Sequence, residues 1–384
     1  MKGTKKFLIG LLAALSAFSG ALALAACGET SDSSTPDSSI VSDSYVDEDR
    51  LVDEGATEDL RYEQVKDKEE YCVIGLGADE QTNIVVSSTY DGLPVTSIAA
   101  QAFSDCTTLK SIVLPNGITS LAYRAFYGCT NLESINIPDT VTSIAGSVFD
   151  RCESLTTLTI PDSVTAISST AFFNCTNLTS ITLPNGLKSI AASMFNGCRK
   201  LASINLPETI TTIGDNAFGY CTSLTSVTIP ATVKSIGYHA FYYCTGLTSI
   251  TLTETITTIG DAAFAGCSKL QFNEYGDAKY LGTATNEHFA LVELKTKDLN
   301  AYTLHENTKV IANAAFSGSV NLTNITIPEG LKIIGASAFE YCTGLENITF
   351  AGTKTQWKAV KKNTKWNSNV PATKVVCSDG DVAL

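Results

Sequence analysis

The sequence predicts a solenoid of stacked repeats, mostly β-structure with short helical turns, and three regularities carry this prediction. A phenylalanine recurs at every twenty-third position, a cysteine follows almost every one three positions later, and a leucine follows six positions later. A fixed period of about 20 to 29 residues with leucine-type spacing is typical of a leucine-rich-repeat solenoid. The phenylalanines are Phe103, Phe126, Phe149, Phe172, Phe195, Phe218, Phe241, Phe264, Phe316 and Phe339. We therefore expect about ten 23-residue repeats, one inserted hairpin and atypical end caps.

Residues 1–26 are predicted to be a lipoprotein signal peptide. Three lysines precede an apolar run from Phe7 to Leu24, and the run ends in Leu24-Ala25-Ala26-Cys27. This ending resembles a bacterial lipobox, which implies cleavage before Cys27 and lipid attachment to it. The alternative is an ordinary secretory peptide followed by an incidental cysteine.

Residues 27–70 are predicted to be a lipidated, acidic, disordered tether, because they contain few large apolar residues. Residues 28–70 hold 15 Asp and Glu against 4 Lys and Arg. Residues 71–384 therefore carry only −5 of the chain's net charge of −13, since the leader carries +3. The acidity says little about the folded part, and nothing indicates nucleic-acid binding.

The folded part is expected to begin with an N-terminal cap at residues 71–94 and to continue as leucine-rich repeats over residues 95–270. In the repeat at 132–152, Leu132-x-x-Ile135-x-Ile137 predicts a short strand with alternate residues facing inward. Pro138 ends that strand because it cannot donate to a ladder. A second extended piece and a tight or helical turn then complete the coil. No single coil can bury its apolar face alone, so each needs a neighbour.

Residues 271–298 break the frame and are predicted to form an inserted hairpin, with strands at 278–282 and 289–294. The insertion could lie on a binding face, or it could be a structural excursion that covers a discontinuity. Repeats resume over residues 299–350. Residues 351–384 are the expected C-terminal cap, in which Trp357 and Trp366 are predicted to pack against the exposed core.

The pattern Leu-Thr-Ser-Ile-Thr-Leu-Pro, followed by Ala-Phe-x-x-Cys, resembles the BspA-like class of bacterial leucine-rich repeats. The resemblance covers residues 84–350. It implies surface display and binding of protein or matrix, with adhesion as the commonest role. It implies no catalytic residue.

The chain shows no arrangement typical of an enzyme, a metal site or a cofactor site. No two cysteines are closer in sequence than one full repeat, whereas metal sites need close pairs. We expect the repeat cysteines to be free, buried thiols that act as small apolar groups. The three histidines, His239, His288 and His305, are scattered.

Two surfaces are candidates for binding. The outward strand positions are small and polar, such as Ser180 and Thr182, and could form a hydroxyl-rich face or be ordinary strand surface. The turns carry aromatic residues that are expected to align along one edge. They could contact a ligand or only pack on one another. The candidate ligand contacts are Tyr127, Phe173, Tyr220, Tyr238, Tyr242 and Tyr243.

These observations favour a non-catalytic protein anchored to the membrane at the bacterial cell surface by lipidated Cys27. Its expected partner is a protein of the host matrix or of a neighbouring cell. The alternatives are a carbohydrate or cell-wall binding module, with a glycan as ligand, and a structural spacer in the envelope.

Overall fold

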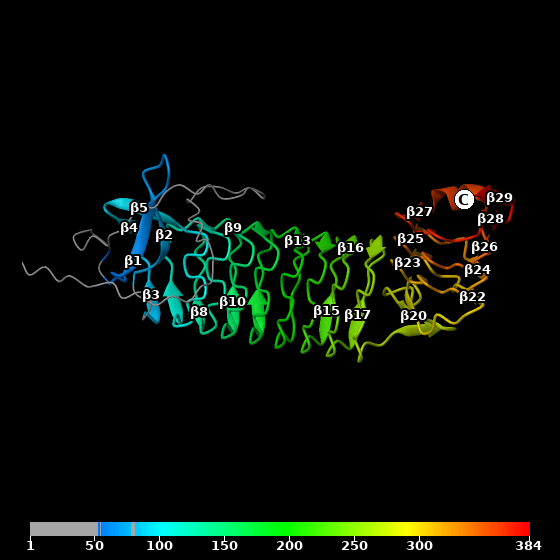
Figure 1. Cartoon of the computed structure of the whole chain (residues 1–384), viewed down its shortest axis with the longest axis horizontal. Coiled ribbons are helices and arrows are strands. Elements are labelled where there is room, and N and C mark those ends of the chain that lie inside the picture. The colour runs from blue at the N-terminus through cyan, green and yellow to red at the C-terminus, as the bar shows by residue number, and fades with distance from the viewer. Residues whose placement is uncertain (1–52, 54, 78–80) are drawn as a thin grey trace, which may run out of the picture.

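The computed structural model describes residues 53, 55–77 and 81–384. The predicted signal peptide, Cys27 and residues 28–52 lie outside the described residues. The described chain is an elongated solenoid whose coils, or rungs, follow one another in a row between two caps (Figure 1). Each rung contributes a strand to two ladders and closes with a turn.

The first ladder, here the long-strand ladder, is formed by the Leu-x-x-Ile-x-Ile segments. Its strands pair in parallel with equivalent positions of adjacent repeats side by side, so that Thr157 lies beside Ser180 and Leu158 beside Ile181. Residues 201–206 follow the same path without strand pairing. The repeat strands are β6 (Ser111–Val113), β8 (Ser134–Ile135), β10 (Thr157–Thr159), β12 (Ser180–Thr182), β15 (Ser226–Thr228), β17 (Ser249–Thr251), β22 (Ala301–Thr303), β24 (Asn324–Ile327) and β26 (Asn347–Phe350).

The second ladder, the short-strand ladder, follows each proline turn and uses two-residue strands in the same register. Ile144 lies beside Ile167, for example. Like positions therefore stack on like positions along both ladders. Its strands are β7 (Ser120–Leu121), β9 (Ser143–Ile144), β11 (Ala166–Ile167), β13 (Ser189–Ile190), β14 (Thr212–Ile213), β16 (Ser235–Ile236), β18 (Thr258–Ile259), β23 (Val310–Ile311), β25 (Ile333–Ile334) and β27 (Lys361–Lys362).

The third side, here called the turn edge, comprises the residues from three before to three after each repeat phenylalanine. Along the turn edge, successive backbone N–H groups point alternately to the next rung and back into their own turn. The N–H groups of Arg124, Phe126 and Gly128 donate to the next rung, at 2.8–3.1 Å, and those between them donate within the turn. The alternation requires positive φ at two positions per rung, such as Ser147 (55°) and Arg151 (61°). The turn edge is thus a third hydrogen-bonded ladder, built from turns rather than from the predicted short helical turns.

The core is a column of parallel phenylalanine rings. From Phe103 to Phe264, neighbouring ring centroids lie 5.3–5.7 Å apart with interplanar angles of 2–14°. Phe218 and its neighbours in the middle of the column are fully buried. Parallel rings at this separation are offset stacks, which add to the free energy gained from burial.

The repeat cysteines do more than fill space. From Cys129 onward, each thiol donates to the carbonyl of the phenylalanine one rung earlier, with Sγ–O distances of 3.0–3.2 Å. Cys106 has no earlier rung and is only partly buried. The prediction of free, buried thiols holds for Cys129 and the later repeat cysteines, and the hydrogen bond is an addition to it.

The N-terminal cap begins earlier than the sequence indicated. Strand β1 (Leu60–Gln64) pairs antiparallel with β2 (Tyr71–Leu76) and lies inside the segment 27–70 that was predicted to be disordered. Leu60 is buried against the core, which explains why this acidic stretch folds. Strand β2 then pairs with β5 (Leu93–Ile98), which pairs with β7, while β3 (Asn83–Val85) starts the long-strand ladder and β4 (Thr89–Tyr90) pairs with β5.

The insertion forms the predicted hairpin and adds a third strand. Strand β19 (Asn273–Tyr275) pairs with β20 (Ala278–Leu281), which pairs antiparallel with β21 (Ala290–Leu294). Strand β21 pairs in parallel with β23, and the N–H of Leu252 donates to the carbonyl of Gly282. The insertion therefore takes the place of a rung, and this supports its interpretation as a structural excursion.

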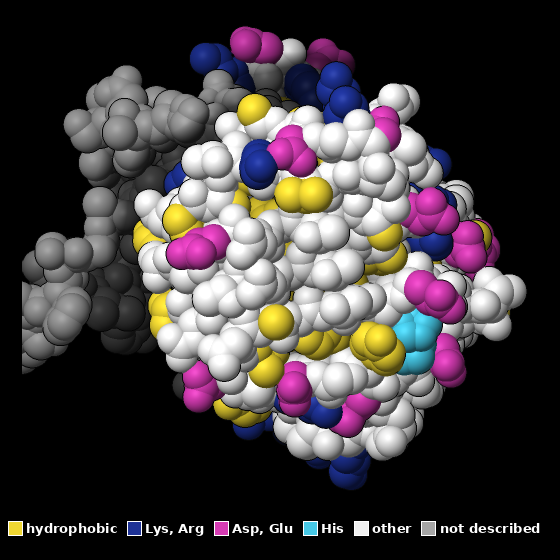
Figure 2. Space-filling view, turned by 90° about the vertical axis from the view of Figure 1, so that its right-hand side faces the viewer, with side chains coloured by type: hydrophobic (Ala, Val, Ile, Leu, Met, Phe, Trp, Pro, Cys, Tyr) yellow, Lys and Arg dark blue, Asp and Glu magenta, His cyan; other side chains and the backbone are white. Residues whose placement is uncertain are grey.

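The C-terminal cap contains helix α1 (Lys354–Ala359), the only helix in the described part of the chain, and strands β28 (Lys374–Cys377) and β29 (Gly380–Ala383). Trp366 lies edge-on to Phe339, with ring centroids 6.1 Å apart, and Trp357 contacts Trp366. Both tryptophans are buried, as predicted. Seen from this end, the hydrophobic surface is divided into small separate patches and charged side chains lie around them (Figure 2).

Burial raises the pKa of the Cys152, Cys175 and Cys198 thiols well above the ordinary value, and that of Cys342 to about 11. Because only the thiolate is alkylated readily, we expect iodoacetamide to label Cys106 first in the native protein. Peptide mapping by mass spectrometry should show Cys152, Cys175, Cys198 and Cys342 labelled only after denaturation. Rapid native labelling of Cys175 would contradict the stacked arrangement.

Candidate functional site

The turn-edge aromatic residues lie along one edge of the solenoid and form separate groups on it. Tyr127, Phe173 and Tyr242 share the position directly after a core phenylalanine, but Asp150, Asn196 and Gly219 hold that position on the rungs between them. Only the rungs of Phe218 and Phe241 bring several rings together. This pair of rungs carries four of the six candidate contacts.

The aromatic cluster consists of Tyr220, Tyr238, His239, Tyr242 and Tyr243. The His239 ring lies between Tyr238 and Tyr242, with centroids 3.7 and 4.1 Å away and nearly parallel planes. Tyr220 is stacked on Tyr243 at 5.7 Å and edge-on to Tyr242 at 5.5 Å. Tyr242 is also edge-on to Tyr243 at 4.6 Å. The five rings therefore form one connected surface.

This cluster is exposed although its rings touch one another. Tyr220, Tyr238 and Tyr243 expose 42%, 45% and 45% of their surfaces. The backbone beneath them is fixed, because the N–H of Tyr220 donates to the carbonyl of Tyr242 at 2.7 Å. Asp215 Oδ1 accepts the N–H of Tyr238 at 2.7 Å. A rigid, exposed group of aromatic rings is suited to contact a partner at a low entropic cost.

Two local features position the cluster. Gly266 lies beneath the Tyr243 ring, and a Cβ at that residue would come within 2.7 Å of the ring. His239 completes the stack, yet it was not among the predicted contacts. Its position one residue after Tyr238 and three before Tyr242 was the available sequence signal.

The remaining candidate aromatics lie elsewhere on the turn edge. Tyr127 contacts arginines: the guanidinium carbons of Arg124 and Arg151 lie 4.7 and 5.8 Å from its ring centroid. Phe173 is half-buried and stacks on no other ring within the described residues. These two residues are therefore not part of the aromatic cluster.

The hydroxyl-rich strand face is present as predicted. Thr157, Thr159, Ser180 and Thr182 are exposed, and their hydroxyls make no hydrogen bond within the described residues. The same is true of the exposed Ser226, Thr228, Ser249 and Thr251. The face is available for hydrogen bonding, but it has no side chain that would give strong selectivity.

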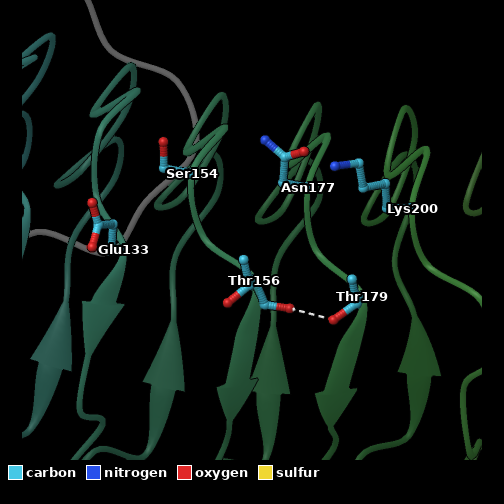
Figure 3. Close-up of a pocket in the computed structure, with 6 residues that line it drawn as sticks. All are labelled: Glu133, Ser154, Thr156, Asn177, Thr179 and Lys200. Atoms are coloured by element: carbon cyan, nitrogen blue, oxygen red, sulfur yellow. Dashed lines mark hydrogen bonds between the residues drawn. The ribbon is translucent and has the colours of Figure 1, made fainter.

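An open depression of about 410 Å³ lies beside this face and is lined by Glu133, Ser154, Thr156, Asn177, Thr179 and Lys200 (Figure 3). Thr179 Oγ1 donates to the Thr156 carbonyl at 3.0 Å, and Asn177 Nδ2 donates to the Glu153 carbonyl at 2.6 Å. These two side chains already link adjacent rungs. The depression is therefore better explained by rung stacking than by ligand binding.

The insertion brings together two of the three histidines. His288 is buried and stacks on His305 with centroids 4.0 Å apart and an angle of 13°. Tyr275 is edge-on to His305 at 4.9 Å. No group of three or more potential metal ligands occurs in the described parts of the chain.

Among the described residues, no helix is long and apolar enough to cross a membrane. The predicted leader, Cys27 included, lies outside these residues, so the lipid anchor stays a prediction.

Comparisons with known proteins identify the repeats. The family model described as BspA type leucine rich repeat region (6 copies) matches residues 82–175, 144–271 and 293–367. No curated protein matches the chain.

The chain is also similar to solved bacterial structures. A leucine rich repeat protein of T. pallidum has 26% identity over 57% of this chain and 91% of its own, with a TM-score of 0.47. A leucine rich cell surface protein from Faecalibacterium prausnitzii has 24% identity over 82% and 98%, with a TM-score of 0.43. A leucine-rich repeat protein from Bacteroides ovatus has 24% identity over 83% and 99%, with a TM-score of 0.46.

The position of His305 predicts that low pH lowers the stability of the protein around the insertion. Burial and the neighbouring His288 lower the pKa of His305, while Glu306 and Glu287 act in the opposite direction. The unfolded chain therefore takes up this proton at a higher pH than the folded protein. Above the ordinary histidine pKa of about 6.5, the neutral His305 contributes its full share to the free energy of unfolding. This contribution is lost as the pH falls from about 6.5 towards the lower pKa of His305 in the folded protein.

We expect His305→Asn to reduce the loss of stability between pH 7.5 and pH 5, measured as the free energy of unfolding in urea. His239→Asn, outside the insertion, is the control. An unchanged pH dependence in His305→Asn would show that this pair does not respond to pH.

Proposed function

This chain belongs to the BspA-type leucine-rich repeat family, and we propose that it is a non-catalytic, lipid-anchored protein of the bacterial cell surface. Its solenoid binds another protein, on the host matrix or on a neighbouring cell, through the aromatic cluster. The observation that carries this proposal is the connected group of five rings, three of which remain more than two-fifths exposed.

The rung geometry supports the choice of this surface. Backbone bonds between rungs hold Tyr220 and Tyr243 in place, both with positive φ, at 58° and 53°. The core below them is filled by Phe218 and Phe241, which are fully buried. The rings are thus not needed to close the core, and their exposed area is available to a partner. Tyrosine is enriched where truncation costs the most binding energy.

The proposed anchor rests on the sequence before the described residues. Leu24-Ala25-Ala26-Cys27 provides the lipidation signal, and residues 28–59 separate it from strand β1. A segment of this length and acidity would hold the solenoid away from an anionic surface. The proposal of adhesion follows from anchoring and binding together.

We expect the triple variant Tyr220→Ser, Tyr242→Ser and Tyr243→Ser to lose about 2 kcal/mol or more of affinity for its protein partner. Surface plasmon resonance of the full chain against a panel of purified matrix proteins would measure this loss of affinity. The free energy of unfolding should change much less than it does in Phe218→Ala. That variant opens a cavity between rungs and should cost about 3–5 kcal/mol.

Tyr341→Ser is the matched control, because Tyr341 occupies the same turn position, has a positive φ of 60° and is 55% exposed, but lies outside the cluster. It should bind like the parent protein. If the triple variant unfolds as readily as Phe218→Ala, the rings are packing residues and the surface lies elsewhere. Binding that disappears when glycans are removed from the partner would favour the carbohydrate alternative.

The anchor makes a separate prediction. Replacing Cys27 by alanine removes the acceptor for the lipid, so the protein should move from the membrane fraction to the medium or persist as an uncleaved precursor. Fractionation with immunoblotting measures both outcomes. Normal membrane retention of Cys27→Ala would overturn the lipoprotein assignment.

A further inference from the structure

A second surface on the turn edge has a different chemistry. It consists of Tyr123, Arg124, Tyr127, Asp150 and Arg151, here called the arginine cluster. The Arg124 guanidinium carbon lies 5.1 Å from the Tyr123 ring centroid and 4.7 Å from that of Tyr127. Arg151, on the next rung, lies 5.8 Å from the Tyr127 centroid. Two cations therefore share one tyrosine ring, on rungs apart from the aromatic cluster.

The arginines are not neutralised by ion pairs. Neither guanidinium lies within 4.0 Å of a carboxylate in the described parts of the protein, although Asp150 is a neighbour in the stack. Arg124 Nε is buried and has no hydrogen-bond partner. Guanidinium groups bind planar anions through several donors at once. Two guanidinium groups that share one tyrosine ring without a paired carboxylate favour an anionic ligand.

Asp150 is the unusual member of this cluster. It is only 8% exposed, and its Oδ1 has no hydrogen-bond partner. It occupies the turn position between Tyr127 and Phe173 on the adjacent rungs. Burial raises its pKa to about 6, while Arg151, Arg124 and a hydrogen bond from Ser147 act to lower it. The other charged or titratable groups nearby are the Asp105 and Glu153 carboxylates, the Tyr123 and Tyr127 phenols, and the thiols of Cys129, Cys152 and Cys175.

The turn edge excludes one way of binding a peptide. The backbone N–H groups from Arg124 to Cys129 all donate to carbonyls of this rung or the next one. An extended peptide could therefore not add to this edge through main-chain bonds. Tyr123 is 47% exposed beside the guanidinium, which offers a ring for stacking next to a charge. Positive φ at Arg124 and Arg151 is shared by the equivalent positions of other rungs and is not evidence for a site.

We propose that the arginine cluster binds an acidic sugar, with a uronic-acid carboxylate held by Arg124 and Arg151 and the sugar ring stacked on Tyr123. Asp150 competes with the ligand for the same positive charge. Its protonation removes that competition, so binding strengthens as the pH falls through the range in which Asp150 takes up a proton. The site does not depend on the protein-binding role of the aromatic cluster.

The test is isothermal titration of the full chain with trigalacturonate at pH 5 and pH 7.5, where the ligand stays ionised. We expect trigalacturonate to bind at least about tenfold more tightly than neutral maltotriose, because charge-assisted hydrogen bonds are lost with the latter. Affinity should fall about fivefold or more between pH 5 and pH 7.5 as Asp150 ionises. Asp150→Asn should keep the tighter affinity at both pH values.

Arg124→Gln and Arg151→Gln should each weaken binding about tenfold. Arg199→Gln is the matched control, since Arg199 is exposed just after a repeat cysteine and outside the cluster. Thermal unfolding of each variant establishes that it is folded. Equal binding of maltotriose, equal or tighter binding of triglutamate, or no binding of trigalacturonate at millimolar concentration would each overturn the proposal.

Discussion

The structure depends on one constraint: every rung must satisfy its polar backbone through its neighbours at a spacing set by β-pairing. On two sides this is ordinary parallel pairing. On the turn edge it requires N–H groups that alternate between the turn and the next rung, and hence positive φ twice per rung. Since a buried, unpaired backbone group is costly, an insertion or deletion within a rung would misalign all three sides at once. The constant repeat length of 23 residues from Phe103 to Phe264 is the consequence.

The same constraint explains why particular side chains recur. A phenylalanine ring on each rung stacks on the ring below only if the rungs are in register, and the cysteine three residues later reaches the carbonyl of the previous phenylalanine. A thiol fits this position because it is small, tolerates an apolar environment and can still donate a weak hydrogen bond. Ser319 holds the position on the first rung after the insertion, and its buried hydroxyl has no partner.

Periodicity in the sequence was sufficient to predict the ladders, the core column and the insertion, because each depends on spacing, and the cap tryptophans followed from the need to cover the last rung. Strand β1 was missed because its burial comes from pairing with Tyr71–Leu76, whereas the segment 28–70 that contains it is acidic as a whole. The thiol hydrogen bonds depend on the carbonyl direction and could not be predicted from residue type. The aromatic candidates fall into separate groups because Asp150, Asn196 and Gly219 hold the positions between them. His239 joins the cluster by stacking between Tyr238 and Tyr242, and its place between them in the sequence was the signal for this.

The insertion at residues 271–298 also affects how the solenoid would respond to a pulling force. Pulling on a solenoid from one end loads the rungs one after another, and a uniform stack would open along its whole length once the first rung opened. Here the phenylalanine column stops at Phe264 and resumes at Phe316, and strands β19 to β21 belong to the sheet that follows the break. At the joint the two parts of the solenoid are held together by backbone hydrogen bonds, from Leu252 to Gly282 and from Asn313 to Ile259, instead of by stacked phenylalanine rings, which makes the joint the expected point of first separation under load.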